Sequence, residues 1–141
     1  MIWGKARRRP AKASGAQIGK RTVHLAACPD CLAGHEASGV VCECGGRSVS
    51  FDSRGEFRQW CVLRNAERAG LITELRRQVR MPLVAEGGVK VGALVLDFVY
   101  CEDGVVVYGD YKGGAATELA SWKMKHFAAQ YGCDVVIFGG R

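Results

Sequence analysis

The sequence predicts an α/β protein in which a small cysteine-rich module precedes a core with the order helix, three strands, helix, strand. Helix start and stop residues bound the segments 53–69 and 117–131, strand-like alternation follows the first helix, and four cysteines cluster within residues 28–44. The chain has 141 residues, of which 48% are hydrophobic and 24% are charged. This length fits one domain with an appendage, and the composition is that of a folded protein.

Composition divides the chain into three segments. Residues 1–22 are rich in Lys, Arg, Ala, Gly and Ser without apolar periodicity, which predicts a basic arm that is disordered until bound. Residues 23–50 contain four of the seven cysteines and predict the cysteine-rich module. Residues 51–141 have the pattern of the compact α/β core.

The positive charge is concentrated in the arm. Residues 1–29 contain seven Lys and Arg residues, among them Arg7, Arg8 and Arg9, and no acidic residue, and the whole chain has a net charge of +6. Such an arm favours a polyanionic partner, of which nucleic acid is the simplest; the alternative is a solubilising tail. Because the sequence has no apolar run of about 18–20 residues and no secretion signal, we expect a cytoplasmic protein without membrane contact.

The four clustered cysteines form two tight pairs, Cys28 with Cys31 and Cys42 with Cys44. Four thiolates satisfy tetrahedral Zn²⁺, and Gly45 permits the tight turn of a zinc knuckle. The pattern resembles a zinc ribbon; the alternatives are a redox pair or free thiols, although the cytosol disfavours disulfides. Because the segment has few large apolar residues, Zn²⁺ would supply its folding energy, and the closed ligand set is typical of a structural site.

The core begins with a helix and an alternating strand. Ser53 and Glu56 fit a capping box at the helix start, and Gly70 fits the helix end. Residues 75–83 then alternate between apolar and polar, which predicts a strand with one wet face. Arg77 interrupts the apolar face of this strand, so we expect it to point into a site.

Residues 91–101 and 104–112 predict two further strands. The first of them is apolar on both faces, which indicates a central strand. Simple alternation places Leu96 and Phe98 on one face and Val99 on the other.

A second helix and a last strand complete the core. Thr117 fits an N-cap, and the helix is expected to continue to about Tyr131 and to stop at Gly132. Residues 135–138 are uniformly apolar and predict a buried strand.

The predicted hairpin brings two carboxylates and a lysine together. If Asp103-Gly104 forms a two-residue turn, Asp97 lies directly across from Asp110, and Lys112 shares their face. Opposed carboxylates repel each other unless a divalent cation binds them, and hard oxygen ligands suit Mg²⁺ or Mn²⁺. The alternative is a solvated pair near the strand ends, with Lys112 as an ion-pair partner only.

Five short segments between Phe51 and Ile137 follow one another in the order of a known family. They are Phe51-Asp52-Ser53 with Glu56, Ala69-Gly70-Leu71-Ile72, Leu96-Asp97-Phe98-Val99-Tyr100, Asp110-Tyr111-Lys112-Gly113 and Lys123-Met124-Lys125. The ordered set resembles small phage-associated endonucleases of the PD-(D/E)XK nuclease superfamily.

This resemblance implies a restriction-endonuclease-like core of αβββαβ order, preceded by the zinc ribbon. It implies that Asp97 and Asp110 hold a catalytic Mg²⁺ or Mn²⁺ and that Lys112 is the catalytic lysine. Glu56 would be a further acidic ligand or would orient a water molecule. The backbone carbonyl of Tyr111 would also reach the metal.

The function that the resemblance implies is metal-dependent DNA endonuclease activity, in the host cytoplasm if the chain is phage-encoded. Related small nucleases point to branched DNA such as a Holliday junction, and paired incisions would require a homodimer. Basic residues of the core would contact phosphates: Arg54, Arg58, Arg77, Lys123 and Lys125. For the two lysines, a solvated helix face is an equal alternative.

Two non-catalytic functions remain as alternatives. The first is a zinc-ribbon protein that binds nucleic acid on a nuclease-like core, and the second is an assembly or packaging factor. The set of Glu56, Asp97, Asp110 and Lys112 argues against the first, because binding alone has no need for facing carboxylates near phosphate. Tight binding without cleavage in Mg²⁺ or Mn²⁺ would favour them.

Overall fold

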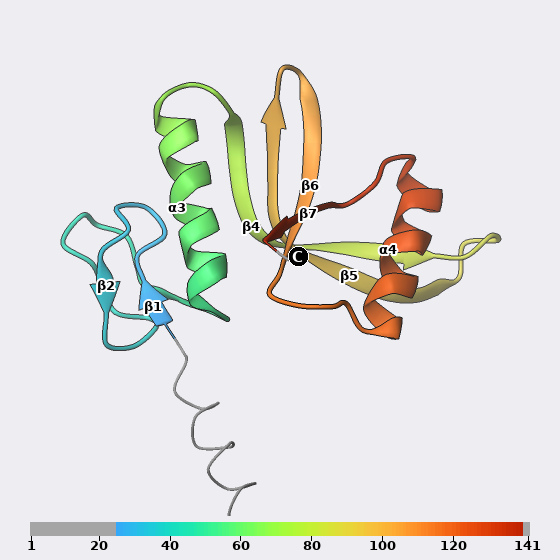
Figure 1. The fold of residues 1–141 in the computed structure, drawn as a ribbon, viewed down its shortest axis with the longest axis horizontal. Coiled ribbons are helices and arrows are strands. Elements are labelled where there is room, and N and C mark those ends of the chain that lie inside the picture. Colours follow the sequence, from blue (N-terminus) through green and yellow to red (C-terminus); the bar gives the residue numbers. More distant parts are fainter. Residues whose placement is uncertain (1–24, 140–141) are drawn as a thin grey trace, which may run out of the picture. The chain divides into compact units, whose positions relative to one another are not determined.

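The computed structural model describes residues 25–139, which divide into two units after Arg54 (Figure 1). The N-terminal unit contains the cysteine-rich module, and the C-terminal unit contains the α/β core. The predicted basic arm of residues 1–22, with Arg7–Arg9, lies outside the described residues. None of the described helices is long and apolar enough to cross a membrane.

Three short strands form the sheet of the N-terminal unit. They are β1 (Leu25–Ala27), β2 (Gly34–His35) and β3 (Val49–Phe51), and β1 lies in the centre, antiparallel to both neighbours. Apart from Phe51, the buried side chains of this unit are small or contain sulfur. This is expected of a module that is too short to bury a large apolar core.

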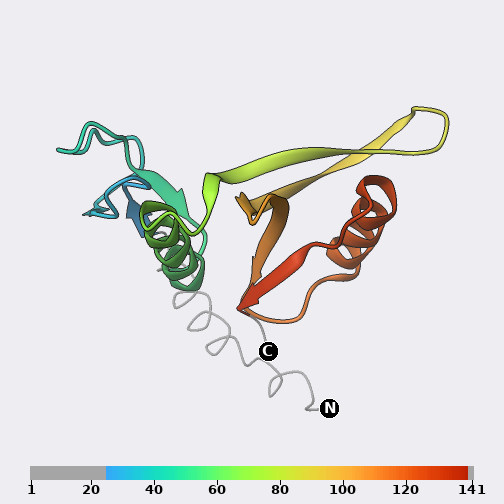
Figure 2. The same ribbon diagram turned by 90° about the horizontal axis from the view of Figure 1, so that it is seen from above.

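The C-terminal unit has the predicted order of helix, three strands, helix and strand. Its elements are α3 (Arg54–Arg68), β4 (Thr73–Val84), β5 (Lys90–Glu102), β6 (Val105–Lys112), α4 (Glu118–Tyr131) and β7 (Val136–Gly139). The strands form a mixed sheet in the order β4-β5-β6-β7, in which only β6 and β7 are parallel. Helix α4 packs on β4 and β5, whose long hairpin is seen in Figure 2.

Local signals determine the boundaries of these elements as predicted. The Thr117 side chain accepts a hydrogen bond from Ala120 N at 3.1 Å and caps α4, and Gly132 ends the helix with a φ of 76°. In the β5–β6 turn, φ is 51° at Asp103 and 80° at Gly104. This left-handed backbone is the one that a two-residue hairpin turn requires.

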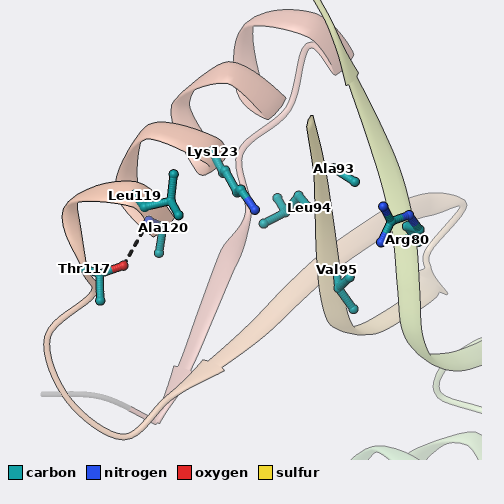
Figure 3. Close-up of a pocket in the computed structure, with 8 residues that line it drawn as sticks. All are labelled: Arg80, Ala93, Leu94, Val95, Thr117, Leu119, Ala120 and Lys123. Atoms are coloured by element: carbon teal, nitrogen blue, oxygen red, sulfur yellow. Dashed lines mark hydrogen bonds between the residues drawn. The ribbon is translucent and has the colours of Figure 1, made fainter. Parts of the chain in front are cut away.

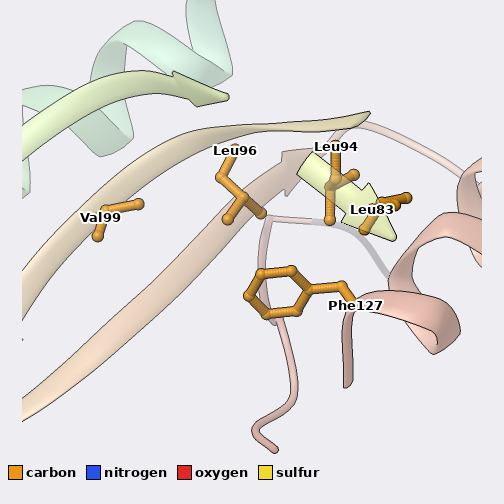
Figure 4. Packing of buried hydrophobic residues seen from close by; sticks show 5 residues of the cluster. All are labelled: Leu83, Leu94, Leu96, Val99 and Phe127. Carbon is orange, nitrogen blue, oxygen red and sulfur yellow. The ribbon is translucent and has the colours of Figure 1, made fainter. Parts of the chain in front are cut away.

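The main apolar cluster lies between the sheet and α4 (Figure 4). Its buried members are Leu83, Leu94, Leu96, Val99 and Phe127. Burying side chains of this size contributes roughly 1.5–3 kcal/mol each. The cluster therefore holds α4 against β4 and β5.

A second apolar contact lies between the sheet and α3, where Phe98 stacks on Trp60 with ring centroids 6.3 Å apart. The prediction that Leu96 and Phe98 share one face, opposite Val99, is therefore wrong, since Leu96 and Val99 belong to the same cluster beneath α4. The regular alternation of side chains between the two faces of β5 is broken between Leu96 and Phe98. On β4, the residue between their partners Val79 and Arg77 is Gln78, whose φ is 53°.

The last strand is an edge strand and not the buried strand that its apolar residues predict. Val136 and Ile137 are 44% and 45% exposed, because β7 pairs with β6 on one side only. Phe138 of this strand packs edge-on against Phe98, with ring centroids 5.8 Å apart. Its ring also covers Gly109, where a Cβ atom would overlap it, so β6 needs a glycine at this position.

Candidate functional site

The four cysteines that were predicted to bind zinc come together in the N-terminal unit. The Sγ atoms of Cys28, Cys31, Cys42 and Cys44 all lie within 4.8 Å of one another. Cys28 Sγ is 3.5 Å from Cys44 Sγ, and Cys31 Sγ is 3.4 Å from Cys42 Sγ. Thiolates bound at about 2.3 Å to a tetrahedral Zn²⁺ are roughly 3.8 Å apart, so this cluster is compatible with a structural zinc site.

Two similar turns present these thiols in pairs. Leu32 N donates a hydrogen bond to Cys28 O, and Gly45 N donates one to Cys42 O, both at 2.9 Å. The residue after each second cysteine has a left-handed backbone, with φ 73° at Leu32 and 97° at Gly45. Glycine adopts this conformation freely, whereas leucine is strained there, which is consistent with a turn that its metal ligands hold in place.

The thiols of the cluster differ in how readily they ionise. Burial raises the pKa of Cys28, but hydrogen bonds from the backbone of Cys31 and Asp30, with a smaller one from the Cys44 thiol, lower it to about 7. The backbone of Cys44 lowers the pKa of Cys42, but the Cys31 thiol and burial outweigh this effect and raise it to about 12. Since a metal binds thiolates, metal binding must release protons and must strengthen as the pH rises.

The predicted carboxylate pair lies in the C-terminal unit. The β5–β6 register is the predicted one, and its continuation by one residue places Asp97 across from Asp110. Asp97 Oδ2 accepts a hydrogen bond from Tyr111 N at 2.8 Å, and Lys112 Nζ lies 2.7 Å from Asp110 Oδ2. Tyr111 thus contacts the pair through its N–H group, whereas the resemblance implies a role for its carbonyl.

The surroundings of Asp97 raise its pKa. Burial raises its pKa, the neighbouring Asp110 carboxyl raises it further, and the charge of Glu56 adds a smaller effect in the same direction. The hydrogen bond from Tyr111 N opposes these effects, and the result is a pKa of about 7. After burial, the neighbouring Asp110 and Glu56 carboxyls contribute to this increase, and a cation bound among these groups would be stabilised.

Gln78 connects two of the acidic residues and was not predicted as a site residue. Its Nε2 donates a hydrogen bond to Asp97 Oδ1 at 3.0 Å and lies 3.4 Å from Glu56 Oε2. Its left-handed backbone costs a residue other than glycine roughly 1–3 kcal/mol, and such strain is concentrated at functional sites. No sequence signal distinguishes Gln78 from the other polar residues on the wet face of β4.

Glu56 and Arg77 approach each other beside this cluster. Glu56 lies in the first turn of α3, and its side chain is buried, with 3% exposure of the residue. One Arg77 guanidinium nitrogen lies 3.8 Å from Glu56 Oε2. Arg77 therefore lies next to a predicted acidic site residue, and its own role in a site stays a prediction.

The other described residues that were predicted to contact phosphate lie away from the carboxylate pair, on the exposed surface or in a groove. Arg54 and Arg58 are exposed on α3, and Lys125 is exposed on α4. Lys123 lines a groove between α4 and the strands (Figure 3).

The cysteine cluster and the acidic residues differ in how closely they match a metal-binding geometry. Within residues 25–139, the cysteines are the one group of three or more Cys, His, Asp or Glu side chains whose ligand atoms are placed to hold a metal ion. Comparisons with protein-family models, with curated proteins and with solved structures found no match.

Proposed function

We propose that the protein is a metal-dependent DNA endonuclease whose active site contains Glu56, Asp97, Asp110 and Lys112. The observation that carries this proposal is the contact between the Asp97 and Asp110 carboxyl groups, with Lys112 Nζ 2.7 Å from the Asp110 carboxylate. A purely structural strand pair gains nothing from two facing carboxylates, because they repel each other. A divalent cation together with a phosphodiester would use both the acidic pair and the adjacent ammonium group.

The donor set suits Mg²⁺ or Mn²⁺. Carboxylate oxygens are hard ligands, and the Asp110 and Glu56 carboxyls, which after burial also raise the pKa of Asp97, add negative charge that a cation would offset. Asp97 and Asp110 would hold the ion, and Glu56 would be the third acidic group. Such an ion, when bound, acidifies a water molecule and neutralises charge on the phosphate.

The protein's own groups have separate roles in this scheme. The N–H of Tyr111 and the amide of Gln78 orient the two oxygens of Asp97. Lys112, beside Asp110, is placed to stabilise the negative charge that develops on the phosphate.

The element order and the cysteine cluster support the same proposal. The order of helix, three strands, helix and strand from α3 to β7 agrees with the αβββαβ order that the resemblance implies. The cysteine cluster, with Zn²⁺ bound, and the basic arm would add affinity for DNA. Branched DNA, cut by a homodimer, is the substrate that the resemblance favours.

The test compares zinc-loaded wild-type protein with Asp110→Asn and with Glu86→Gln, which removes an exposed acidic group between β4 and β5. Each protein is incubated with supercoiled plasmid and with a four-way junction in Mg²⁺, Mn²⁺ or EDTA. We expect wild type and Glu86→Gln to cut DNA only with metal, and Asp110→Asn to be slower by about 100-fold or more. Circular dichroism checks that all three proteins are folded.

Binding of both DNAs without cleavage in either metal would contradict the proposal. It would favour a zinc-ribbon protein that binds nucleic acid without catalysis, for which the four clustered cysteines are the supporting observation. Cleavage that persists in Asp110→Asn would show that these carboxylates do not perform the reaction.

A further inference from the structure

We infer that the groove between α4 and the β4–β5 hairpin binds a single-stranded segment of the DNA substrate, next to the phosphate that is cut. The inference rests on the proposed function, because it extends the path of the DNA beyond the proposed active site. The groove has a volume of about 380 Å³, which is within the range of sites that hold a molecule the size of a nucleotide. Figure 3 shows its lining residues, which come from α4 and its N-cap on one side and from the strands on the other.

The charge of the groove is positive. Arg80 from β4 and Lys123 from α4 line it, and no acidic residue does. In the part of the chain that the structure describes, neither of them is paired with a carboxylate, whereas Arg64, Arg77 and Lys112 are. Their charges are therefore open to an anion, and the phosphate backbone of DNA is the polyanion that the proposed function brings to this surface.

The remaining lining is largely apolar. It includes Leu119 of α4 and Leu94 and Val95 of β5. Leu119 is 62% exposed and Val95 is 41% exposed, so this apolar surface is accessible. A phosphate group alone does not need such a surface, but the face of an unstacked base would be removed from water against these aliphatic side chains. The bases of duplex DNA are already paired and stacked, so the groove favours a single strand.

The groove is next to the proposed active site along β5. Val95 pairs with Arg80 and precedes Asp97 by two residues. At about 3.3 Å per residue, the two positions on the strand are roughly 7 Å apart. A DNA strand with one phosphate at Asp97 would therefore reach the groove with a neighbouring nucleotide.

The test measures equilibrium binding in the absence of Mg²⁺, so that cleavage plays no part. The probes are a fluorescein-labelled oligothymidylate and a labelled duplex of equal length. Arg80→Ala and Lys123→Ala remove the charges of the groove, and Arg76→Ala and Lys125→Ala remove exposed charges on the same strand and helix that do not line it. Leu119→Ser removes part of the apolar surface without changing the charge.

We expect Arg80→Ala and Lys123→Ala each to weaken oligothymidylate binding by about 5- to 10-fold and to reduce the salt slope by about 0.7. Arg76→Ala and Lys125→Ala should change both quantities much less. Leu119→Ser should weaken oligothymidylate binding by about 3-fold and should leave duplex binding unchanged.

Equal losses from all four charge substitutions would overturn the inference, because overall electrostatics would then explain the binding. A Leu119→Ser protein with unchanged oligothymidylate affinity, or with an equal loss for the duplex, would also overturn it. If the expected binding pattern is found but plasmid and junction remain uncut in every metal, the groove is supported and the nuclease proposal fails.

Discussion

Replacing Asp97 by asparagine is expected to stabilise the metal-free protein above pH 7, although the change removes a proposed metal ligand. The pKa of Asp97 is raised from its ordinary value of 3.8 to about 7 by burial and by the Asp110 carboxyl. Between about pH 4 and pH 7 the native protein therefore keeps a proton on Asp97 that the unfolded chain releases. The free energy of unfolding of the wild type therefore falls as the pH rises through this window. The asparagine amide does not titrate, so the variant does not lose this stability.

The size of the effect follows from the pKa and from the burial of the side chain. At about 1.4 kcal/mol for each pH unit, the full change would correspond to about 4 kcal/mol. Asp97 is only half-buried, so solvent screens its interactions, and we expect about 1–2 kcal/mol. The amide oxygen can still accept from Tyr111 N, but the NH₂ group then stands in place of Oδ1, so the hydrogen bond from Gln78 Nε2 is lost and offsets part of the gain. Asp97→Asn should therefore exceed wild type in free energy of unfolding by about 1–2 kcal/mol at pH 8, and by little near pH 4.

Urea denaturation followed by tryptophan fluorescence measures this difference on zinc-loaded samples without Mg²⁺ or chelator. Both proteins have the same cysteine cluster, so zinc release at low pH cancels when they are compared at one pH. Asp103→Asn changes an exposed aspartate in the β5–β6 turn and should match wild type at every pH. Added Mg²⁺ should stabilise wild type more than Asp97→Asn. Equal or lower stability of Asp97→Asn at pH 8 without Mg²⁺ would refute the argument that burial and Asp110 strain this carboxyl group.

Other substitutions test the packing and the two groups of site residues. Gly109→Ala should lower the free energy of unfolding by about 1–3 kcal/mol in urea, because its methyl group overlaps an aromatic ring of β7, whereas Gly92→Ala meets open space and should change little. Cys31→Ser should lose bound zinc on dialysis, measured by metal analysis; full zinc retention would show that this thiol is not a ligand. Gln78→Gly should relieve backbone strain and raise the stability to urea, yet slow DNA cleavage by about 10-fold or more, because Asp97 loses its amide partner. Unchanged cleavage would remove Gln78 from the positioning residues.

The elements that the sequence predicted well are those with strong local signals. The Thr117 side chain accepts a hydrogen bond from a free backbone N–H group in the first turn of α4, and the Asp103-Gly104 turn adopts the left-handed backbone that a tight hairpin needs. A turn of defined length also determines the register of the two strands that it joins. This is why a dipeptide at the tip of the hairpin was enough to predict that Asp97 and Asp110 face each other.

The features that could not be predicted depend on tertiary structure. The change of faces along β5 lies beside Gln78 of β4, which has a left-handed backbone, and glutamine, unlike glycine or asparagine, does not indicate such a torsion in a sequence. The exposure of Val136 and Ile137 depends on whether another strand pairs with β7, and the same apolar run fits a buried strand or an edge strand. The role of Glu56 was inferred from a family resemblance, and its contact with Gln78 required the packing of α3 beside β4.

The two candidate metal sites differ in ligand chemistry, and this difference decides how their roles can be separated. Four thiolates favour Zn²⁺, whereas the carboxylate oxygens of Asp97 and Asp110 favour Mg²⁺ or Mn²⁺. EDTA removes both kinds of ion, so loss of activity in EDTA would be compatible with either site alone. Asp110→Asn leaves the cysteines in place, and Cys31→Ser leaves the carboxylates in place. A cleavage defect with DNA binding retained in the first variant, and a defect in folding or binding in the second, would together assign the chemistry to the carboxylates and a structural role to the zinc.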